Sequence, residues 1–82
     1  MIKAVIIEDN PEISALNSML LKEYFSDKII LAGKADSVDE GIKRIKSINP
    51  DLVLCDIEIK GGTSFDMLEQ LRPYDFKTIF IT

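Results

Sequence analysis

Carboxylates follow two apolar runs in this sequence. Glu8 and Asp9 come directly after residues 3–7, and Asp56 follows the apolar residues of the stretch 51–58. Several carboxylates brought together repel one another, so a divalent cation would stabilise them. An all-oxygen ligand set suits Mg²⁺, whereas a chain with no histidine and one cysteine is a poor source of zinc ligands. A carboxylate beside Mg²⁺ can also attack phosphorus and form an aspartyl phosphate.

The same residues also fit ordinary structural roles. By itself, an acidic pair after a strand can be part of a solvated loop as readily as part of a metal site, because charged residues commonly occupy loops. Asp56 can equally cap the loop that follows it. The glycines at positions 61 and 62 fit a turn better than a phosphate cradle, because the chain contains neither a GxGxxG nor a P-loop pattern. Thr82 alone is an ordinary strand residue, so only the acids taken together indicate a site.

The elements that must position these acids alternate along the chain. Apolar, mostly β-branched runs predict strands at residues 3–7, 29–33, 51–56 and 78–82. Apolar residues at helical spacing predict helices at residues 11–24, 38–48 and 65–71. This alternation predicts a parallel sheet with helices on both faces and right-handed crossovers. Ligands of such sheets bind outside the carboxyl ends of the strands, so the acids and Thr82 are expected to converge on one cleft.

Capping residues set the predicted helix boundaries. Asn10 is the expected N-cap of the first helix, and Pro11 occupies its first turn. Ser37 and Glu40 form an expected capping box at the start of the second helix. The Asn-Pro pair after residue 48 ends that helix, because proline disfavours α geometry in the residue before it.

Each predicted helix carries one apolar face. In the first helix it consists of Ile13, Leu16, Leu20, Leu21 and Tyr24. In the second it consists of Ile42, Ile45 and Ile48, and in the third of Phe65, Leu68 and Leu71. Thr63 or Ser64 caps the third helix and Pro73 closes it. The segment before it, residues 58–62, is predicted to be a flexible loop.

Composition limits the classes of protein that this chain can belong to. Its 82 residues, 46% of them hydrophobic, allow one small domain with a modest core. The net charge of −4 argues against a nucleic-acid or anionic-membrane surface within these residues. No segment approaches the roughly 20 apolar residues that span a bilayer. Cys55, the single cysteine, lies in an apolar run and is expected to be a small buried side chain, which suits the cytoplasm.

Four features in order resemble the receiver domain of bacterial two-component response regulators. They are the acidic pair after the first strand, the apolar strand ending at Asp56, the sequence Asp-Ile-Glu-x-x-Gly-Gly-x-Ser-Phe-Asp-x-Leu at residues 56–68, and the Ile-Phe-Ile-Thr strand ending at Thr82. The third feature resembles receivers attached to LytTR-type DNA-binding domains. The resemblance covers the whole chain and implies a flavodoxin-like, doubly wound parallel sheet with strand order 2-1-3-4.

The resemblance implies a role for each site residue. Asp56 would be the phosphoacceptor, taking a phosphoryl group from a phosphohistidine of a sensor histidine kinase. Asp9 would bind Mg²⁺ directly, and Glu8 would act through water. Glu58 would give the metal its backbone carbonyl, and Thr82 would be the switch hydroxyl. The implied activity is phosphotransfer to the protein itself followed by hydrolysis, rather than enzymatic turnover.

The chain also departs from the family pattern. Lys60 replaces a proline that is usual after the acceptor, and Ser64 stands where glycine usually precedes the third helix's aromatic residue. The family's fourth helix, fifth helix and fifth strand, which bears a lysine, have no counterpart. Residues 1–82 are therefore predicted to be the N-terminal part of a receiver domain, truncated after the fourth strand. The exposed edge of that strand predicts a homodimer or a domain-swapped oligomer.

Two other functions compete with the phosphoacceptor. The first is a scaffold or dimerisation module that keeps the fold but is not phosphorylated, because the family's lysine has no counterpart. The second is a Mg²⁺-dependent phosphohydrolase with an aspartate nucleophile. Such hydrolases use a second aspartate two residues after the first as an acid, and Glu58 occupies that position here. The hydrolase therefore ranks last.

Overall fold

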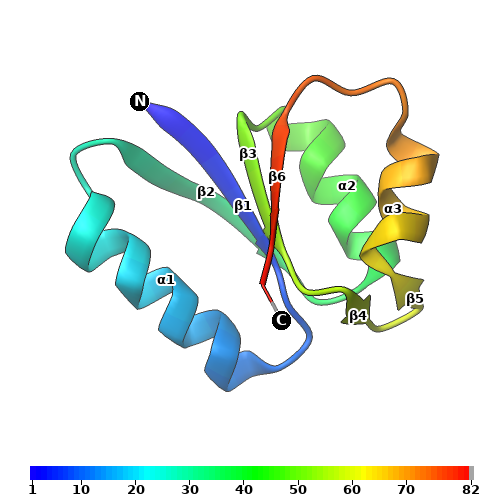
Figure 1. The fold of residues 1–82 in the computed structure, drawn as a ribbon, viewed down its shortest axis with the longest axis horizontal. Helices are drawn as coiled ribbons and strands as arrows, with labels where there is room; N and C mark the ends of the chain where they lie inside the picture. The colour runs from blue at the N-terminus through cyan, green and yellow to red at the C-terminus, as the bar shows by residue number, and fades with distance from the viewer. Residues whose placement is uncertain (82) are drawn as a thin grey trace.

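The computed structural model describes residues 1–81 and contains a four-stranded sheet with helices on both faces (Figure 1). The elements follow one another as β1 (Ile2–Ile7), α1 (Pro11–Phe25), β2 (Ile29–Ala35), α2 (Val38–Ile48), β3 (Leu52–Cys55), β4 (Glu58–Ile59), β5 (Gly62–Thr63), α3 (Ser64–Leu71) and β6 (Lys77–Phe80). The four strands and three helices expected from the sequence are all present. The strand predicted at residues 78–82 is β6, and Thr82 lies outside the described residues.

The strands of the main sheet run in the order β2-β1-β3-β6, and every neighbouring pair is parallel. This confirms the flavodoxin-like arrangement, with β6 as the fourth strand. Ile7 at the end of β1 lies opposite Cys55 at the end of β3. The residues that follow these two strands therefore emerge side by side at one edge of the sheet.

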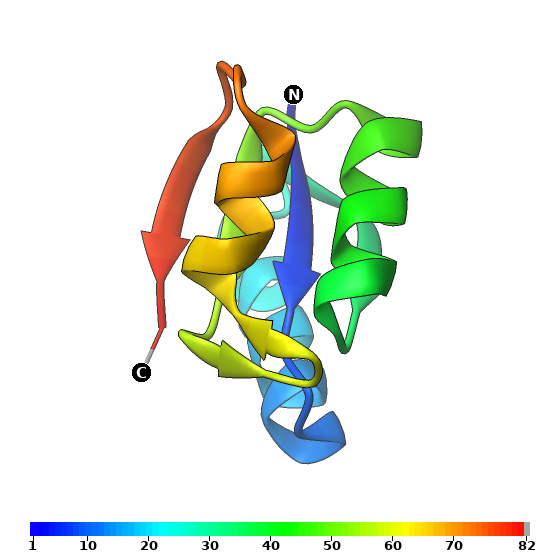
Figure 2. The ribbon, with the colours of Figure 1, turned by 90° about the vertical axis from the view of Figure 1, so that its right-hand side faces the viewer.

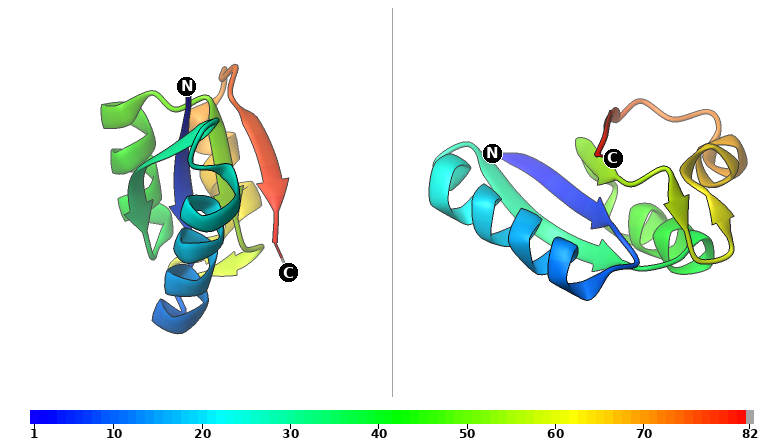
Figure 3. Two further views of the ribbon diagram at one scale, coloured as in Figure 1. Left: turned by 90° about the vertical axis from the view of Figure 1, so that its left-hand side faces the viewer. Right: turned by 60° about the horizontal axis from the view of Figure 1, so that its bottom comes forward.

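Helices cover the two faces of the sheet unequally. Figure 2 shows α2 and α3 in front of the sheet and α1 behind it, and Figure 3 shows α1 from the other side. The larger core cluster comprises Val5, Ile7, Ala35, Val38, Ile45, Val53, Cys55, Ile59, Met67 and Leu68. The smaller comprises Ile6, Leu21 and Leu54. None of the helices among residues 1–81 is long and apolar enough to cross a membrane.

Most of the apolar face predicted for α1 is exposed, so the prediction that this face is buried is mostly wrong. Four of its residues are between 40% and 69% exposed, namely Ile13, Leu16, Leu20 and Tyr24. Of the predicted face only Leu21 is buried, and the helix also buries Ser14, which lies two turns away on the same side. The cap of this helix is as expected, because Asn10 Oδ1 accepts hydrogen bonds from the backbone N–H groups of Glu12 and Ile13.

Two details of the other helices also differ from expectation. Ser37 Oγ accepts a hydrogen bond from the Glu40 N–H at 3.1 Å, which is one of the two bonds of the expected capping box. Among the described residues the complete capping box lies at α3, between Thr63 and Asp66. In α3 the apolar spacing missed Met67, which is fully buried, and wrongly placed Phe65 in the core.

The predicted flexible loop at residues 58–62 is instead a two-stranded antiparallel hairpin made by β4 and β5. Its turn uses positive φ angles at Gly61 (90°) and Gly62 (147°), which glycine adopts without a steric penalty. Ile59 is buried in the larger core cluster, and the Lys60 carbonyl accepts a hydrogen bond from the Val38 N–H at 2.9 Å. The hairpin is therefore tied to the start of α2, and the glycine pair fills the turn role expected for it.

Candidate acidic site at the carboxyl ends of the strands

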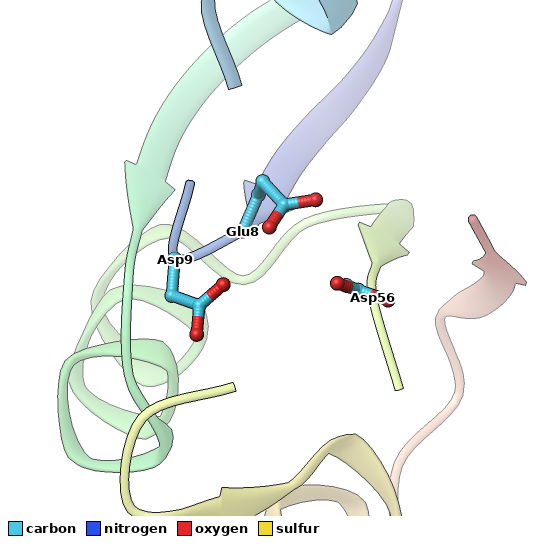
Figure 4. Close-up of side chains that lie close together, drawn as sticks. All are labelled: Glu8, Asp9 and Asp56. Carbon is cyan, nitrogen blue, oxygen red and sulfur yellow. The ribbon is translucent and has the colours of Figure 1, made fainter. Parts of the chain in front are cut away.

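Three carboxylates meet at the carboxyl ends of β1 and β3. One oxygen from each of Glu8, Asp9 and Asp56 lies within 4.8 Å of the others, and Figure 4 shows the three side chains around a common space. The sheet holds this arrangement through its backbone, since the Asp56 N–H donates to the Ile7 carbonyl at 3.1 Å. The structure thus brings together the three acids that the sequence singled out. We call them the acidic cluster.

Glu8 is the most deeply placed member of the acidic cluster, with 5% of its surface exposed. Burial raises the pKa of its carboxyl group above the usual value. A hydrogen bond from the Asn10 N–H to Oε2 (3.1 Å) lowers the pKa, while the nearby charges of Asp56 and Asp9 raise it further. Glu8 is therefore a carboxylate whose ionised form is costly without a cation.

The peptide that joins Asp56 to Ile57 is held at both ends. Its N–H, from Ile57, donates to Asp56 Oδ1 at 2.8 Å, and its carbonyl, from Asp56, accepts a hydrogen bond from the Ser64 hydroxyl. The Ser64 N–H also donates to the Ile57 carbonyl at 2.8 Å. Ser64 was not among the site residues predicted from the sequence. The available signal was a serine where the resembling family usually has glycine.

An open hollow of about 740 Å³ adjoins Asp56. It is lined by Asp9, Asp56, Ile57, Glu58 and Ile59, so no basic side chain of the described residues lines it. The Glu58 side chain is exposed, and Thr82 lies outside the described residues. Lys60, which departs from the family pattern, is directed instead to Asp36, at 3.8 Å.

The acidic cluster fits a hard divalent cation. Its donors are carboxylate oxygens, the ligands that Mg²⁺ prefers. Their mutual repulsion and the burial of Glu8 favour a bound cation. No basic side chain lines the hollow beside Asp56, whereas Lys34, Arg44 and Lys60 line a second hollow that Glu8 and Asp9 share. A zinc site would need nitrogen or sulfur ligands. Cys55 is buried, as expected, and burial raises the pKa of its thiol, so it stays protonated.

Residues 4–82 match the response regulator receiver domain family over nearly the whole chain. The chain belongs to this family. Receiver domains are signalling modules, and they are generally not turnover enzymes. The acidic cluster lies where the parallel strands of this receiver domain end, as expected for a ligand site in a doubly wound sheet.

The receiver domain is similar to portions of larger proteins. It is 33% identical over 79 residues to the DNA-binding transcriptional activator EvgA of Escherichia coli K12, covering 95% of the chain and 37% of EvgA. It is 27% identical to the crystal structure of the response regulator PhyR of Brucella abortus, with a TM-score of 0.83 over 96% of the chain and 32% of PhyR. The crystal structure of a LuxR-family response regulator of Staphylococcus aureus has a TM-score of 0.87 at 24% identity. The match covers 98% of the present chain and 67% of the crystallised chain, and it shows the common fold.

Proposed function

We propose that this receiver domain accepts a phosphoryl group on Asp56 from a phosphohistidine of a sensor histidine kinase. The proposal rests on the position of Glu8 and Asp9 close to Asp56 in the acidic cluster. The aspartate at the end of β3 faces a hollow, where a phosphoryl group has space to approach. A two-component pathway in the cytoplasm is the setting in which such a domain works.

Different residues of the chain have different roles in the phosphoryl transfer. An Asp56 carboxylate oxygen forms the bond to phosphorus, while the bond from phosphorus to the histidine nitrogen breaks and its electron pair stays on that nitrogen. Asp9 and Asp56 would hold Mg²⁺ directly, Glu8 would act through water, and the Glu58 backbone carbonyl would complete the protein ligands. When bound, the ion would supply positive charge that offsets the charge of the phosphoryl oxygens. The role of Thr82 as the switch hydroxyl is proposed from the family resemblance alone.

The substitution Asp56→Asn is expected to abolish phosphorylation. The amide is isosteric with the carboxylate but is not a nucleophile toward phosphorus. The protein is incubated with Mg²⁺ and a small acyl phosphate or a phosphorylated sensor kinase, and the adduct is detected by intact mass as a hydroxylamine-labile phosphoryl group. Asp51→Asn is the matched control, because Asp51 lies at the opposite end of β3, where it accepts a hydrogen bond from the Lys3 N–H at 2.8 Å.

The pattern of labelling separates the phosphoacceptor from the scaffold and the phosphohydrolase. Labelling of wild type and Asp51→Asn but not of Asp56→Asn supports the phosphoacceptor. Absence of label in wild type with both donors would reject it and favour the scaffold. Repeated turnover of a phosphomonoester that disappears in Asp56→Asn would instead favour the phosphohydrolase.

We also propose that the receiver domain controls a DNA-binding effector domain. EvgA, described as a DNA-binding transcriptional activator, supports this, and the chain spans 37% of its length. The LytTR subclass rests only on the resemblance of residues 56–68. The Staphylococcus aureus protein described as LuxR-family is a structural relative at 24% identity and supports the fold rather than either subclass.

We further propose that two copies pair through the outer edge of β6. The N–H groups of Lys77 and Ile81 donate to carbonyls of residues 51 and 55, at the two ends of β3. Because strand residues alternate in direction, the backbone groups of Thr78 and Phe80 point away from β3. In an antiparallel pair centred on Ile79, Thr78 of each copy would meet Phe80 of the other.

The substitution Ile79→Lys is expected to disrupt this dimer, because a charged side chain on an edge strand opposes pairing. Ile30→Lys is the matched control: Ile30 is 51% exposed on β2, at the other edge, and Ile79 is 50% exposed. Light scattering after size exclusion should show a dimer for wild type and for Ile30→Lys and a monomer for Ile79→Lys. A wild-type monomer at high concentration would contradict the proposal.

A further inference from the structure

Ser64 is a fully buried polar residue at the first position of α3. A buried hydroxyl is costly unless it is hydrogen-bonded, and this one donates to the backbone carbonyl of Asp56. Its own N–H donates to the Ile57 carbonyl at 2.8 Å. The start of α3 therefore holds two successive carbonyls of the chain directly after β3.

The carbonyl that Ser64 holds belongs to the same planar peptide as the Ile57 N–H. That N–H donates to Asp56 Oδ1 at 2.8 Å. Fixing one end of a rigid peptide fixes the direction of the other. The Ser64 hydroxyl thus sets the direction of the N–H group that holds the Asp56 carboxylate, while one oxygen of that carboxylate points toward Glu8 and Asp9 (Figure 4).

The Ser64 hydroxyl lies on a helix that is anchored by its N-cap and by its buried face. Thr63 caps α3 through a complete capping box with Asp66, and Met67 and Leu68 bury the next turn of the helix in the core. A group on an anchored helix can position a neighbour more accurately than a group on a free loop. Ser64 therefore joins the packed face of α3 to the Asp56 peptide.

We propose that Ser64 is a positioning residue for Asp56, whose hydroxyl orients the Asp56–Ile57 peptide and through it the carboxylate that receives the phosphoryl group. This rests on the proposed function of Asp56. A carboxylate that is no longer oriented reacts more slowly, because misplacement by about 1 Å can cost up to roughly 10²-fold in rate.

The test compares Ser64→Ala with Thr63→Ala. The first removes the hydroxyl that holds the Asp56 carbonyl, whereas the second removes the N-cap of the same helix and leaves that hydroxyl in place. Two readouts are used: the rate of phosphorylation by a small acyl phosphate with Mg²⁺, and the hydrogen-exchange rate of the Ile57 amide measured by NMR without any phosphodonor. Thermal melts show the stability of each variant.

Ser64→Ala is expected to slow phosphorylation roughly ten- to a hundredfold and to accelerate exchange of the Ile57 amide, relative to Thr63→Ala. Equal effects of the two variants on both readouts, or no effect of Ser64→Ala, would overturn the proposal. If Ser64→Ala does not fold, Ser64→Gly takes its place, because it also lacks the hydroxyl. If wild type is not phosphorylated, the proposed function fails, and the Ile57 exchange rates still decide whether Ser64 orients the peptide.

Discussion

Glu8→Gln is expected to be more stable than wild type when divalent cations are chelated and less stable than wild type when Mg²⁺ is abundant. Without a cation, the charge of Glu8 is buried beside Asp9 and Asp56, and the neutral amide removes that repulsion. With Mg²⁺, wild type gains binding energy that the variant largely loses. At about one hundred times its dissociation constant, a ligand that binds only the folded state stabilises it by about 2.7 kcal/mol.

The pH dependence of wild type follows from the same carboxyl group. Because burial and neighbouring acids raise the pKa of folded Glu8 above its usual value of 4.5, the folded state binds this proton more tightly than the unfolded state. In chelator, the contribution of Glu8 to stability therefore improves as the pH falls from neutral through the raised pKa toward 4.5. In Glu8→Gln this contribution is absent.

Thermal melts in chelator and in excess Mg²⁺, at neutral pH and near pH 5, measure these effects. A stabilisation of about 2.7 kcal/mol corresponds to a rise in Tm of roughly 10–20 °C for a domain of this size. Glu23→Gln is the matched control, because Glu23 is exposed on α1 and outside the acidic cluster. An equal response of wild type and Glu8→Gln to Mg²⁺ would show that Glu8 takes no part in binding the cation.

The proximity of the three acids could be predicted from the sequence because parallel strands have a fixed geometry. Apolar runs located β1 and β3, and the carboxyl ends of parallel strands lie at one edge of the sheet. The acids after these runs therefore had to come close to one another, as Glu8, Asp9 and Asp56 do. Burial of Glu8 and the hydrogen bond from Ser64 depend on packing, which spacing along the chain does not encode.

The errors in the fold have the same origin. Helical spacing found an apolar stripe on α1, but it does not say which element covers that stripe. Only Leu21 of the stripe is buried, together with Ser14. The hairpin of β4 and β5 was missed because strands of two residues are too short to show alternation. Its stability comes from tertiary contacts of Ile59 and from the bond between Lys60 and Val38.

Met67→Ala is expected to lower the free energy of unfolding by about 2–5 kcal/mol, the range for truncating a buried methionine. Met67 is fully buried in the larger core cluster. Its sulfur lies only 2.5 Å from where a Cβ on Gly41 would stand, so α3 packs directly against the backbone of α2 at this point. Removing the side chain leaves a cavity between the two helices that hydrophobic neighbours can fill only in part.

Met19→Ala is the matched control for this prediction, because Met19 is 55% exposed on α1 and its truncation should change stability by no more than about 0.5 kcal/mol. Urea denaturation followed by circular dichroism measures both variants. A loss below about 1 kcal/mol for Met67→Ala, or one equal to that of Met19→Ala, would contradict the packing. Since α3 also carries Ser64, loosening the anchor at Met67 should increase exchange of the Ile57 amide even at temperatures where the domain remains folded, which links the core to the orientation of Asp56.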